Sequence, residues 1–263
     1  MIAIESLDDA HLAGYRALAD PAFLVAAGVL VAEGRLVVQR LLALPRFRTQ
    51  SVLVTPAAAD ALTGALAAMP SPPPVYLVGQ AVMNGVAGFN IHRGCLALAE
   101  RPAIPVLSAA ALAGARRLVV LEHVNNPDNV GGIFRSAAAF GVDAVILGPE
   151  CGDPLYRKAI RTSMSGTLQV PFAYAGQWPE ALTTLRHRGF RVLALTPAPD
   201  ARALDDVPRN LDRVALVVGS EGDGLSAEAL AAADEHVRIP MPGSADSLNV
   251  TVAASIALHH FSA

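Results

Sequence analysis

The sequence predicts an α/β fold with two domains: a small α/β domain, then a larger domain with a mostly parallel sheet and flanking helices. The chain has 263 residues, enough for one large or two modest domains. Short apolar runs alternate with helical stretches, as in parallel sheets joined by crossover helices. Residues 101–105 include two prolines and predict a stiff hinge. The expected domains are therefore 1–100 and 105–263.

The first hundred residues predict a compact alternating unit. Residues 1–20 predict an extended arm or a short helix. The continuous apolar run 22–32 predicts a buried strand, and residues 35–44 have apolar positions at helical spacing. The other elements expected here are a strand at 51–54, a helix at 57–68 opened by Pro56, a strand at 75–78 and an apolar run within 89–98 that turns at Gly94.

The second part of the chain predicts another alternating unit. A short helix is expected at 109–115. Strands are expected at 118–121, 144–147, 191–195, 214–218 and 236–239, with helices between most of them. This order predicts a parallel sheet, and open sheets of this kind bind ligands at the carboxyl ends of their strands.

Composition limits the function classes. Apolar residues make up 53% of the chain and aromatic residues 5%, so Ala, Val and Leu are expected to fill the core. The formal net charge is −3 and Lys158 is the sole lysine, so nucleic-acid binding would depend on a local arginine patch. Cys95 and Cys151 are expected to be buried thiols. No cluster has metal-ligand spacing, so no metal is expected.

The longest apolar run, 22–32, is too short to span a bilayer. It is not preceded by a cationic leader. We therefore expect a cytoplasmic protein without membrane contact.

Three polar, glycine-rich blocks are the most informative feature. They read NNPDNVGGIFR at 125–135, VGSEGDGL at 218–225 and IPMPGSADSLNV at 239–250. Each follows or overlaps a predicted strand. The groups that would face a ligand are mostly backbone amides, with few functional side chains. This set suits a nucleoside-type cofactor and a polyanionic substrate.

These blocks resemble the motifs of the SpoU-type (TrmH-like) RNA 2′-O-ribose methyltransferases of the SPOUT superfamily, over about residues 105–260. The residues that match the first motif are Asn126, Pro127, Asn129, Gly131, Ile133, Arg135, Ser136, Ala137, Phe140 and Gly141. The resemblance implies a deep trefoil knot near the carboxyl end and a homodimer paired through the knotted region, in which one subunit's residues complete the other's site. It also implies S-adenosylmethionine as cofactor and transfer of its methyl group to a ribose 2′-hydroxyl of rRNA or tRNA.

The resemblance also implies cofactor contacts, which would be made mainly by backbone groups. They are expected at Gly219, Ile239, Met241, Gly243 and Leu248. Glycine at position 219 would let the backbone approach a ligand closely. Without a ligand, the same loop could be a tight strand-to-helix turn.

By the same resemblance, Arg135 activates the ribose hydroxyl. Because arginine stays protonated in proteins, we expect Arg135 to stabilise a developing alkoxide, while the proton leaves through phosphate or water. Whether Arg135 itself accepts the proton is left open. Its apolar neighbours predict a partly buried charge that needs a partner. Glu221 is expected to be that partner or a solvated acid.

Three further polar residues are expected at the site. Asn129 could cap the helix that starts near Val130, orient Arg135 or the ribose, or do both. Ser247 and Asn249 open the last helix, where serine is a favoured cap, and the resemblance places both beside the reacting groups. His259 and His260 are expected in a frayed tail.

The first domain and the densest basic stretch are expected to bind RNA. Residues 33–34 and 92–97 resemble a ribosomal-protein-like substrate-binding domain that precedes many family members. Phosphate contacts are expected from Arg157, Lys158, Arg161, Arg46 and Arg93. A solvated helix face would explain the stretch 156–161 equally well.

Two other functions compete with this interpretation. A dinucleotide-dependent oxidoreductase would also use glycine-rich turns on a parallel sheet, but no G-x-G-x-x-G follows the first strand. A catalytically silent RNA-binding protein could have the same fold. The joint presence of the polar residues named above favours an enzyme.

Overall fold

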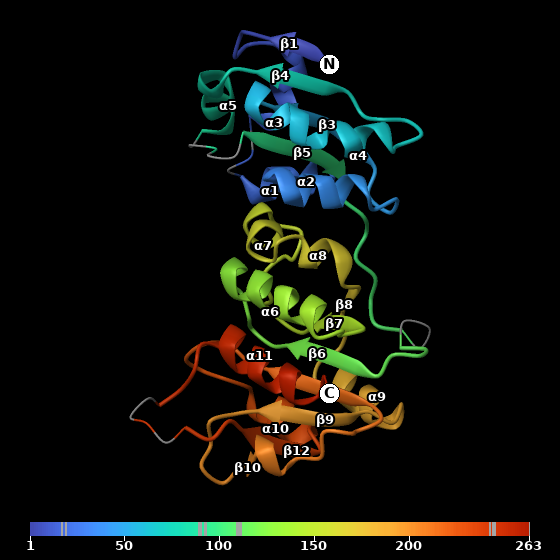
Figure 1. The fold of residues 1–263 in the computed structure, drawn as a ribbon. Coiled ribbons are helices and arrows are strands. Elements are labelled where there is room, and N and C mark those ends of the chain that lie inside the picture. Colours follow the sequence, from blue (N-terminus) through green and yellow to red (C-terminus); the bar gives the residue numbers. More distant parts are fainter. Residues whose placement is uncertain are drawn as a thin grey trace. The chain divides into compact units, whose positions relative to one another are not determined.

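The computed structural model describes residues 1–16, 18, 20–88, 91, 94–108, 112–241, 243 and 246–262. Its contacts divide the chain into two units (Figure 1). Unit 1 comprises Met1–Ala103 and Leu155–Leu168; unit 2 comprises Ile104–Pro154 and Gln169–Ala263. The predicted boundaries assigned 155–168 to the second domain, whereas this segment groups with unit 1.

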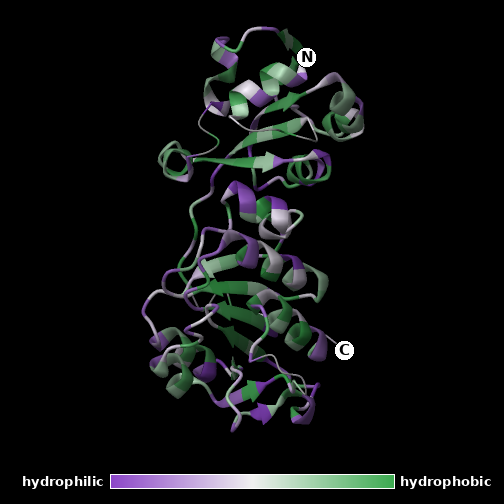
Figure 2. Ribbon diagram, turned by 90° about the vertical axis from the view of Figure 1, so that its left-hand side faces the viewer, coloured by the Kyte–Doolittle hydropathy of each residue, from purple (hydrophilic) through white to green (hydrophobic). Residues whose placement is uncertain are grey.

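Unit 1 contains a mixed five-stranded sheet in the order β1-β4-β3-β5-β2. Its strands are β1 (Ile2–Ile4), β2 (Val29–Glu33), β3 (Thr49–Val54), β4 (Val75–Val78) and β5 (Cys95–Glu100). β4 runs parallel to β1 and β3, and β5 runs antiparallel to β2 and β3. Hydrophobic residues concentrate in the strands of both units (Figure 2).

The predicted strand at 22–32 is wrong in its first half. Pro21–Ala26 form helix α1, and only Val29–Glu33 form a strand. The side chain of Asp20 accepts a hydrogen bond from the Phe23 amide at 3.1 Å, and Pro21 opens the helix. Gly28, with φ of +66°, turns the chain into β2. An apolar run alone does not distinguish a buried strand from a helix.

The remaining helices of unit 1 are short. They are η1 (Ala10–Tyr15), α2 (Arg35–Leu42), α3 (Pro56–Ala59), η2 (Asp60–Leu62), α4 (Thr63–Ala67), α5 (Gln80–Ala87), α7 (Arg157–Thr162) and, at its boundary, α8 (Gly166–Gln169). The single helix predicted at 57–68 is thus divided into three short helices, α3, η2 and α4. Helix α5 was not predicted.

Unit 2 contains a seven-stranded sheet in the order β10-β12-β9-β11-β6-β7-β8. All its strand pairs are parallel, as predicted. The strands are β6 (Arg117–Leu121), β7 (Ala144–Leu147), β8 (Phe172–Tyr174), β9 (Arg191–Leu195), β10 (Arg202–Ala203), β11 (Val214–Val218) and β12 (Glu235–Arg238). Only the two short edge strands, β8 and β10, were missed.

The helices of unit 2 are α6 (Pro127–Ala139), α9 (Glu180–His187), η3 (Leu204–Asp206), α10 (Ala227–Ala232) and α11 (Val250–His260). α6 and α11 pack closely because small residues meet between them. A Cβ atom on Gly132 would lie 2.5 Å from the Thr251 side chain, and the hydroxyls of Ser136 and Ser255 are 2.6 Å apart.

Two other predictions in unit 2 were wrong. The histidines near the end are not in a frayed tail: both lie in α11, and buried His260 meets the Val207 carbonyl oxygen at 2.8 Å. Of the helix expected at 109–115, residues 109–111 lie outside the described residues, and 112–114 form a turn. The trefoil knot stays a prediction. No described helix is long and apolar enough to cross a membrane.

Sheet register brings the polar blocks together. Leu121 pairs with both Val218 and Leu147, and Val217 pairs with Ala194. The strands β6, β7, β9 and β11 therefore end at one edge, so the loops that follow them are neighbours.

Candidate active site

The first polar block forms the start of α6. Asn126 caps the helix, since its side-chain oxygen accepts from the Asp128 amide at 2.9 Å, and Pro127 occupies the first turn. Asn129, one of the expected caps, instead lies inside the helix and is buried. Its side-chain oxygen accepts a hydrogen bond from the Asn249 amide at 3.0 Å. Asn129 is therefore positioned to orient neighbouring groups.

The second block forms a tightly closed loop between β11 and α10. A Cβ atom at Gly219 would lie 2.3 Å from the backbone of Gly224. Ser220 and Gly224 form an isolated β-bridge, and Gly222 and Gly224 have positive φ angles. Glycine at position 219 is thus required by contacts within the loop itself, before any ligand is considered.

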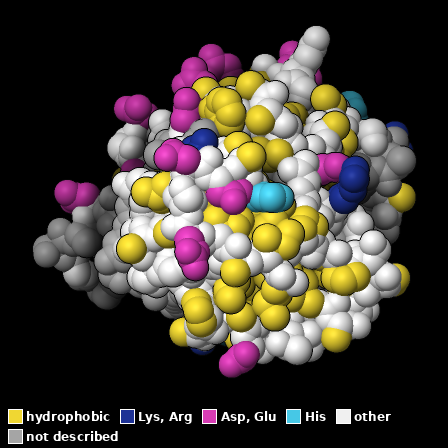
Figure 3. Space-filling view, turned by 90° about the horizontal axis from the view of Figure 1, so that it is seen from above, with side chains coloured by type: hydrophobic (Ala, Val, Ile, Leu, Met, Phe, Trp, Pro, Cys, Tyr) yellow, Lys and Arg dark blue, Asp and Glu magenta, His cyan; other side chains and the backbone are white. Residues whose placement is uncertain are grey.

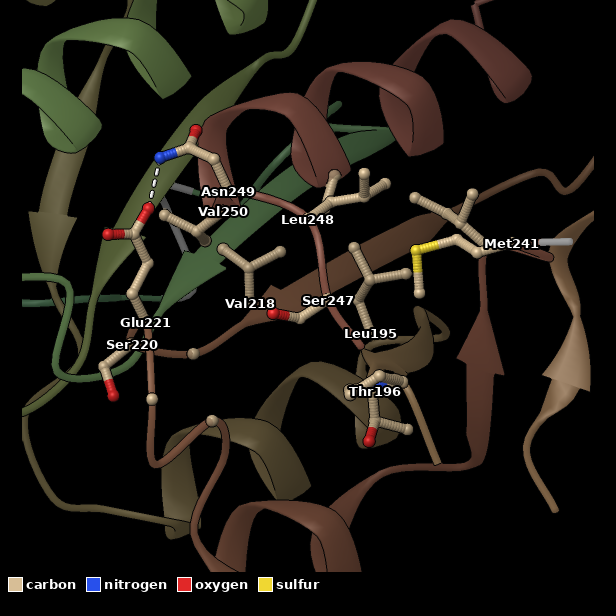
Figure 4. Close-up of a pocket in the computed structure, with 16 residues that line it drawn as sticks. Leu195, Thr196, Val218, Ser220, Glu221, Met241, Ser247, Leu248, Asn249 and Val250 are labelled. Carbon is tan, nitrogen blue, oxygen red and sulfur yellow. Dashed lines mark hydrogen bonds between the residues drawn. The ribbon is translucent and has the colours of Figure 1, made fainter. Parts of the chain in front are cut away.

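The third block contains Asn249, which connects all three. Asn249 is the cap of α11, accepting from the amides of Thr251 at 3.0 Å and Val252 at 3.3 Å; the predicted alternative, Ser247, is not the cap. The same side chain donates to Asn129 and to a Glu221 oxygen, the bond drawn in Figure 4. One amide therefore holds one residue of the first block and one of the second.

A cavity of about 430 Å³ opens beside this contact (Figure 4). Predicted residues that line it are Gly219, Glu221, Ile239, Met241, Ser247, Leu248 and Asn249. Gly243 is not among the lining residues. Sequence reasoning missed Leu195, Thr196 and Pro197, which line the cavity where β9 ends. Their position after a predicted strand was the available signal.

A second cavity, also about 430 Å³, is predominantly polar. It shares Ser220 and Glu221 with the first. Its other lining residues are His123, Val124, Asn125, Asn126, Asn129, Glu150 and Asp223. His123 and Glu150 have φ angles of 55° and 53°, a conformation that non-glycine residues seldom adopt and that clusters at functional sites. An apolar and a polar cavity thus meet at Glu221.

Arg135 does not lie where the sequence suggested. It is exposed on α6 rather than partly buried, and it lines neither cavity. Within the described part of the chain it has no hydrogen-bond or ion-pair partner, and Glu221 bonds to Asn249 instead. The cluster at Asn249 therefore contains Asn129, Glu221 and Asn249 without the arginine.

The residues expected to bind RNA are partly engaged within unit 1. Arg157, with only 13% of its side chain exposed, forms an ion pair with Glu33, and Arg161 lies 3.4 Å from the same carboxylate. Arg46 donates to the Leu168 carbonyl oxygen, and Lys158 is half-buried. Arg93 lies outside the described residues. Of the two arginines that contact Glu33, Arg161 is half exposed and leaves more room for a phosphate.

Seen from above, the molecule presents apolar and acidic side chains, with few Lys or Arg (Figure 3). Exposed apolar residues of unit 1 include Met1, Ile2 and Leu7 near its first strand. Such a face does not attract phosphate.

Neither cysteine is suited to nucleophilic chemistry. Burial raises the pKa of Cys151 to about 11 and that of Cys95 to about 12, so both remain thiols at neutral pH. No group of three or more His, Cys, Asp or Glu side chains that could hold a metal occurs among the described residues.

Comparison with known proteins identifies the family. The SpoU rRNA methylase family matches residues 116–259. Uncharacterized tRNA/rRNA methyltransferases from Mycobacterium bovis and Mycobacterium tuberculosis are 46% identical over 233 residues, which are 88% of this chain and 80% of each relative.

Solved structures agree with the fold. An RNA 2′-O ribose methyltransferase has a TM-score of 0.81 at 25% identity, covering 99% of this chain and 98% of that one. An AdoMet-bound rRNA methyltransferase from Sinorhizobium meliloti has a TM-score of 0.82 at 24% identity, covering 98% and 96%. The chain belongs to the SpoU rRNA methylase family of RNA methyltransferases.

Proposed function

We propose that this protein transfers the methyl group of S-adenosylmethionine to a ribose 2′-hydroxyl of structured rRNA or tRNA. The observation that carries the proposal is the Asn249 amide, which joins Asn129 and Glu221 where the apolar cavity meets the polar one. The family and the names of the relatives support this substrate class. Family membership also argues against the oxidoreductase alternative.

The residues of the apolar cavity fit S-adenosylmethionine. The volume of the cavity is in the range of small-molecule sites. Leu195, Ile239 and Leu248 offer apolar walls for an adenine ring. The glycine-rich loop offers backbone groups for the polar parts, and the Glu221 carboxylate is complementary to a positively charged ligand.

The chain's own residues would then position the nucleophile. When bound, S-adenosylmethionine supplies a methyl group on a sulfonium sulfur, which is already a good leaving group. Asn249 holds Glu221 and Asn129 at the border of the polar cavity, where a ribose can be bound. Orienting the hydroxyl in line with the methyl group is the main task that remains. Arg135 stabilises the negative charge that develops on the 2′-oxygen.

We further propose a homodimer in which Arg135 reaches the cavities of the partner subunit. Arg135 is exposed and lines neither cavity of its own chain. On α11, Val252 and Ile256 are 46% and 40% exposed and lie four residues apart, which puts them on one side of the helix. The apolar side of α11 and the exposed Arg135 on the neighbouring helix α6 suit a dimer interface at which each subunit completes the other's active site.

RNA recognition is assigned to residues 1–100 together with Arg157, Lys158 and Arg161. Arg46 and Arg93 belong to the same proposal. Because the net charge is −3, specificity would come from a few local contacts rather than from a general attraction for RNA. With rRNA or tRNA as substrate, the protein would act in the cytoplasm.

The test combines binding and transfer. Calorimetric titration with S-adenosylmethionine and NAD should give binding of the first alone. Labelled methyl transfer to RNA from a strain that lacks the gene, followed by mapping of methylated riboses, should give one 2′-O-methyl position. Cofactor binding without transfer to any RNA would favour the silent RNA-binding protein. Transfer to a base would contradict the ribose assignment.

A further inference from the structure

Glu122 has the only buried carboxyl group among the residues that the structure describes. It directly follows β6, and none of its side chain is exposed. A buried carboxyl group is costly unless hydrogen bonds satisfy it. Since Glu122 lines neither cavity, its function must come from the groups that it binds.

The Glu122 carboxyl group accepts three hydrogen bonds. One oxygen accepts from the Ser226 hydroxyl at 2.6 Å and from the Trp178 indole N–H at 2.7 Å. The other accepts from the Ser226 amide at 2.8 Å. The Ser226 oxygen in turn accepts from the Ala229 amide at 3.1 Å and so caps α10.

These bonds hold the glycine loop at both ends. The Glu122 amide donates to the Val218 carbonyl oxygen at 2.9 Å, immediately before the loop, while its carboxyl group binds Ser226, immediately after it. Between these points, Gly219, Ser220 and Glu221 line the apolar cavity. The loop is closed by contacts between Gly219, Ser220 and Gly224, and the bonds to Glu122 add an anchor at each of its ends.

We propose that Glu122 is a positioning residue that fixes the conformation of loop 219–225 through Ser226, and with it the geometry of the cofactor cavity. Trp178, the sole tryptophan of the chain, binds the same carboxyl group and is therefore a built-in reporter of this contact. The part that concerns the cofactor rests on the proposed function; the part that concerns the loop does not.

Glu122→Gln is the informative substitution because it keeps the size and shape of the side chain. An amide has one acceptor and one donor end. In one orientation its NH₂ group faces the Ser226 amide, and in the other it faces the Trp178 indole N–H. In either orientation the NH₂ group of the glutamine therefore faces another N–H group, and no hydrogen bond can form there. The control is Glu228→Gln at an exposed position of α10, which makes the same substitution two residues beyond Ser226.

The first measurement needs no cofactor. Amide hydrogen exchange across residues 219–229 should become about tenfold faster in Glu122→Gln, the scale of losing one hydrogen bond, while β6, β9 and β11 keep wild-type rates. Trp178 fluorescence should change in the same variant. Glu228→Gln should match the wild type in both. Unchanged exchange in the loop, or a uniform increase throughout unit 2, would overturn the inference.

The second measurement is cofactor affinity. The dissociation constant for S-adenosylmethionine should rise about tenfold in Glu122→Gln. If the wild type binds the cofactor and the variant binds it equally well, Glu122 does not set the geometry of the cofactor cavity. If the wild type binds no S-adenosylmethionine, the proposed function fails while the exchange result still decides the role of Glu122. Should Glu122→Gln not fold, Ser226→Ala removes one of the three bonds together with the cap of α10, and it must show faster exchange in residues 219–225, which precede the helix.

Discussion

At the scale of single residues, Gly219 offers a sharp test because its requirement is steric. A methyl group there would lie 2.3 Å from the Gly224 backbone, so Gly219→Ala must open the loop that lines the cofactor cavity. We expect affinity for S-adenosylmethionine to fall by tenfold or more. Gly243→Ala is the matched control, since nothing lies within 4 Å of its added carbon. Equal affinity of both variants in a calorimetric titration would show that the loop tolerates a side chain.

Arg135 allows transfer and binding to be separated. Arg135→Ala should lower single-turnover methyl transfer by roughly a hundredfold, the scale of losing one donor to a developing oxyanion. Cofactor affinity should change little, because the proposed cofactor contacts are made at Gly219, Ile239 and Leu248. Arg135→Lys should not rescue transfer, since lysine lacks the planar fork of donors.

The control is Arg209→Ala, which removes another exposed arginine of unit 2. It should transfer methyl groups at the wild-type rate. If Arg135→Ala also retains near-full transfer on saturating RNA, the arginine has a structural role and the proposed stabilisation of the alkoxide is wrong.

At the scale of elements, Asn249 joins helix α11 to helix α6 and to the loop 219–225. Asn249→Asp keeps a good cap for α11 but loses the amide that donates to Asn129 and Glu221. It also sets a carboxylate beside Glu221. We expect a melting temperature near that of the wild type, with methyl transfer strongly reduced. Asn249→Ala should lose transfer and, in addition, about 1 kcal/mol of stability from the missing cap. Active Asn249→Asp would show that the cap alone matters.

The strands at the β10 end of the second sheet provide a pH-dependent test. Glu235 on β12 accepts hydrogen bonds from Arg202 on β10 and Arg191 on β9. The bond from Arg202 has the largest effect, and together with the bond from Arg191 it holds the pKa of Glu235 below its usual value of 4.5. A carboxylate whose pKa is lower in the folded state stabilises the fold above pH 4.5, and this contribution disappears as the pH falls through the folded-state pKa. Glu235→Gln should therefore lower stability at pH 7 by at most about 1 kcal/mol. Denaturation at strongly acidic pH should not distinguish the variant, and a loss that persists there would contradict the ion-pair explanation.

Periodicity predicted long elements well and local details poorly. The core strands of unit 2 were found because continuous apolar runs mark buried parallel strands. The run 22–32 was misassigned because Asp20, just before it, and Gly28, within it, decide the local backbone. The two-residue strand β10 has too few residues to show any period.

Motifs likewise predicted which residues form the site but not how they meet. Asn129, Glu221 and Asn249 were selected by spacing, yet their joint contact spans 120 residues of sequence and needs the sheet register to be known. Arg135 was expected to be buried because its neighbours in sequence are apolar, but those neighbours face the other side of α6. Glu122 gave no signal, since one glutamate after a strand is indistinguishable from a surface residue.

At the scale of the whole molecule, the prediction is a homodimer whose subunits share their active sites. Sedimentation at micromolar concentration should give twice the mass of one chain. Ile256→Glu, which sets a charge on the exposed apolar side of α11, should give the mass of a single chain and abolish methyl transfer. A single-chain mass for the wild type would refute the dimer.

Mixing two inactive variants tests whether Arg135 acts across the interface. In a dimer of Arg135→Ala with Asn249→Ala, an arginine that reaches the partner leaves one site with both changes and the other site with neither. Random exchange of subunits makes half of the dimers mixed, so about a quarter of wild-type methyl transfer should return. If Arg135 serves its own chain instead, every site carries one change and no activity returns. Since Arg135 lines neither cavity of its own subunit, we expect recovery, and its absence in a mixture that sedimentation shows to be dimeric would show that Arg135 does not act at the partner's site.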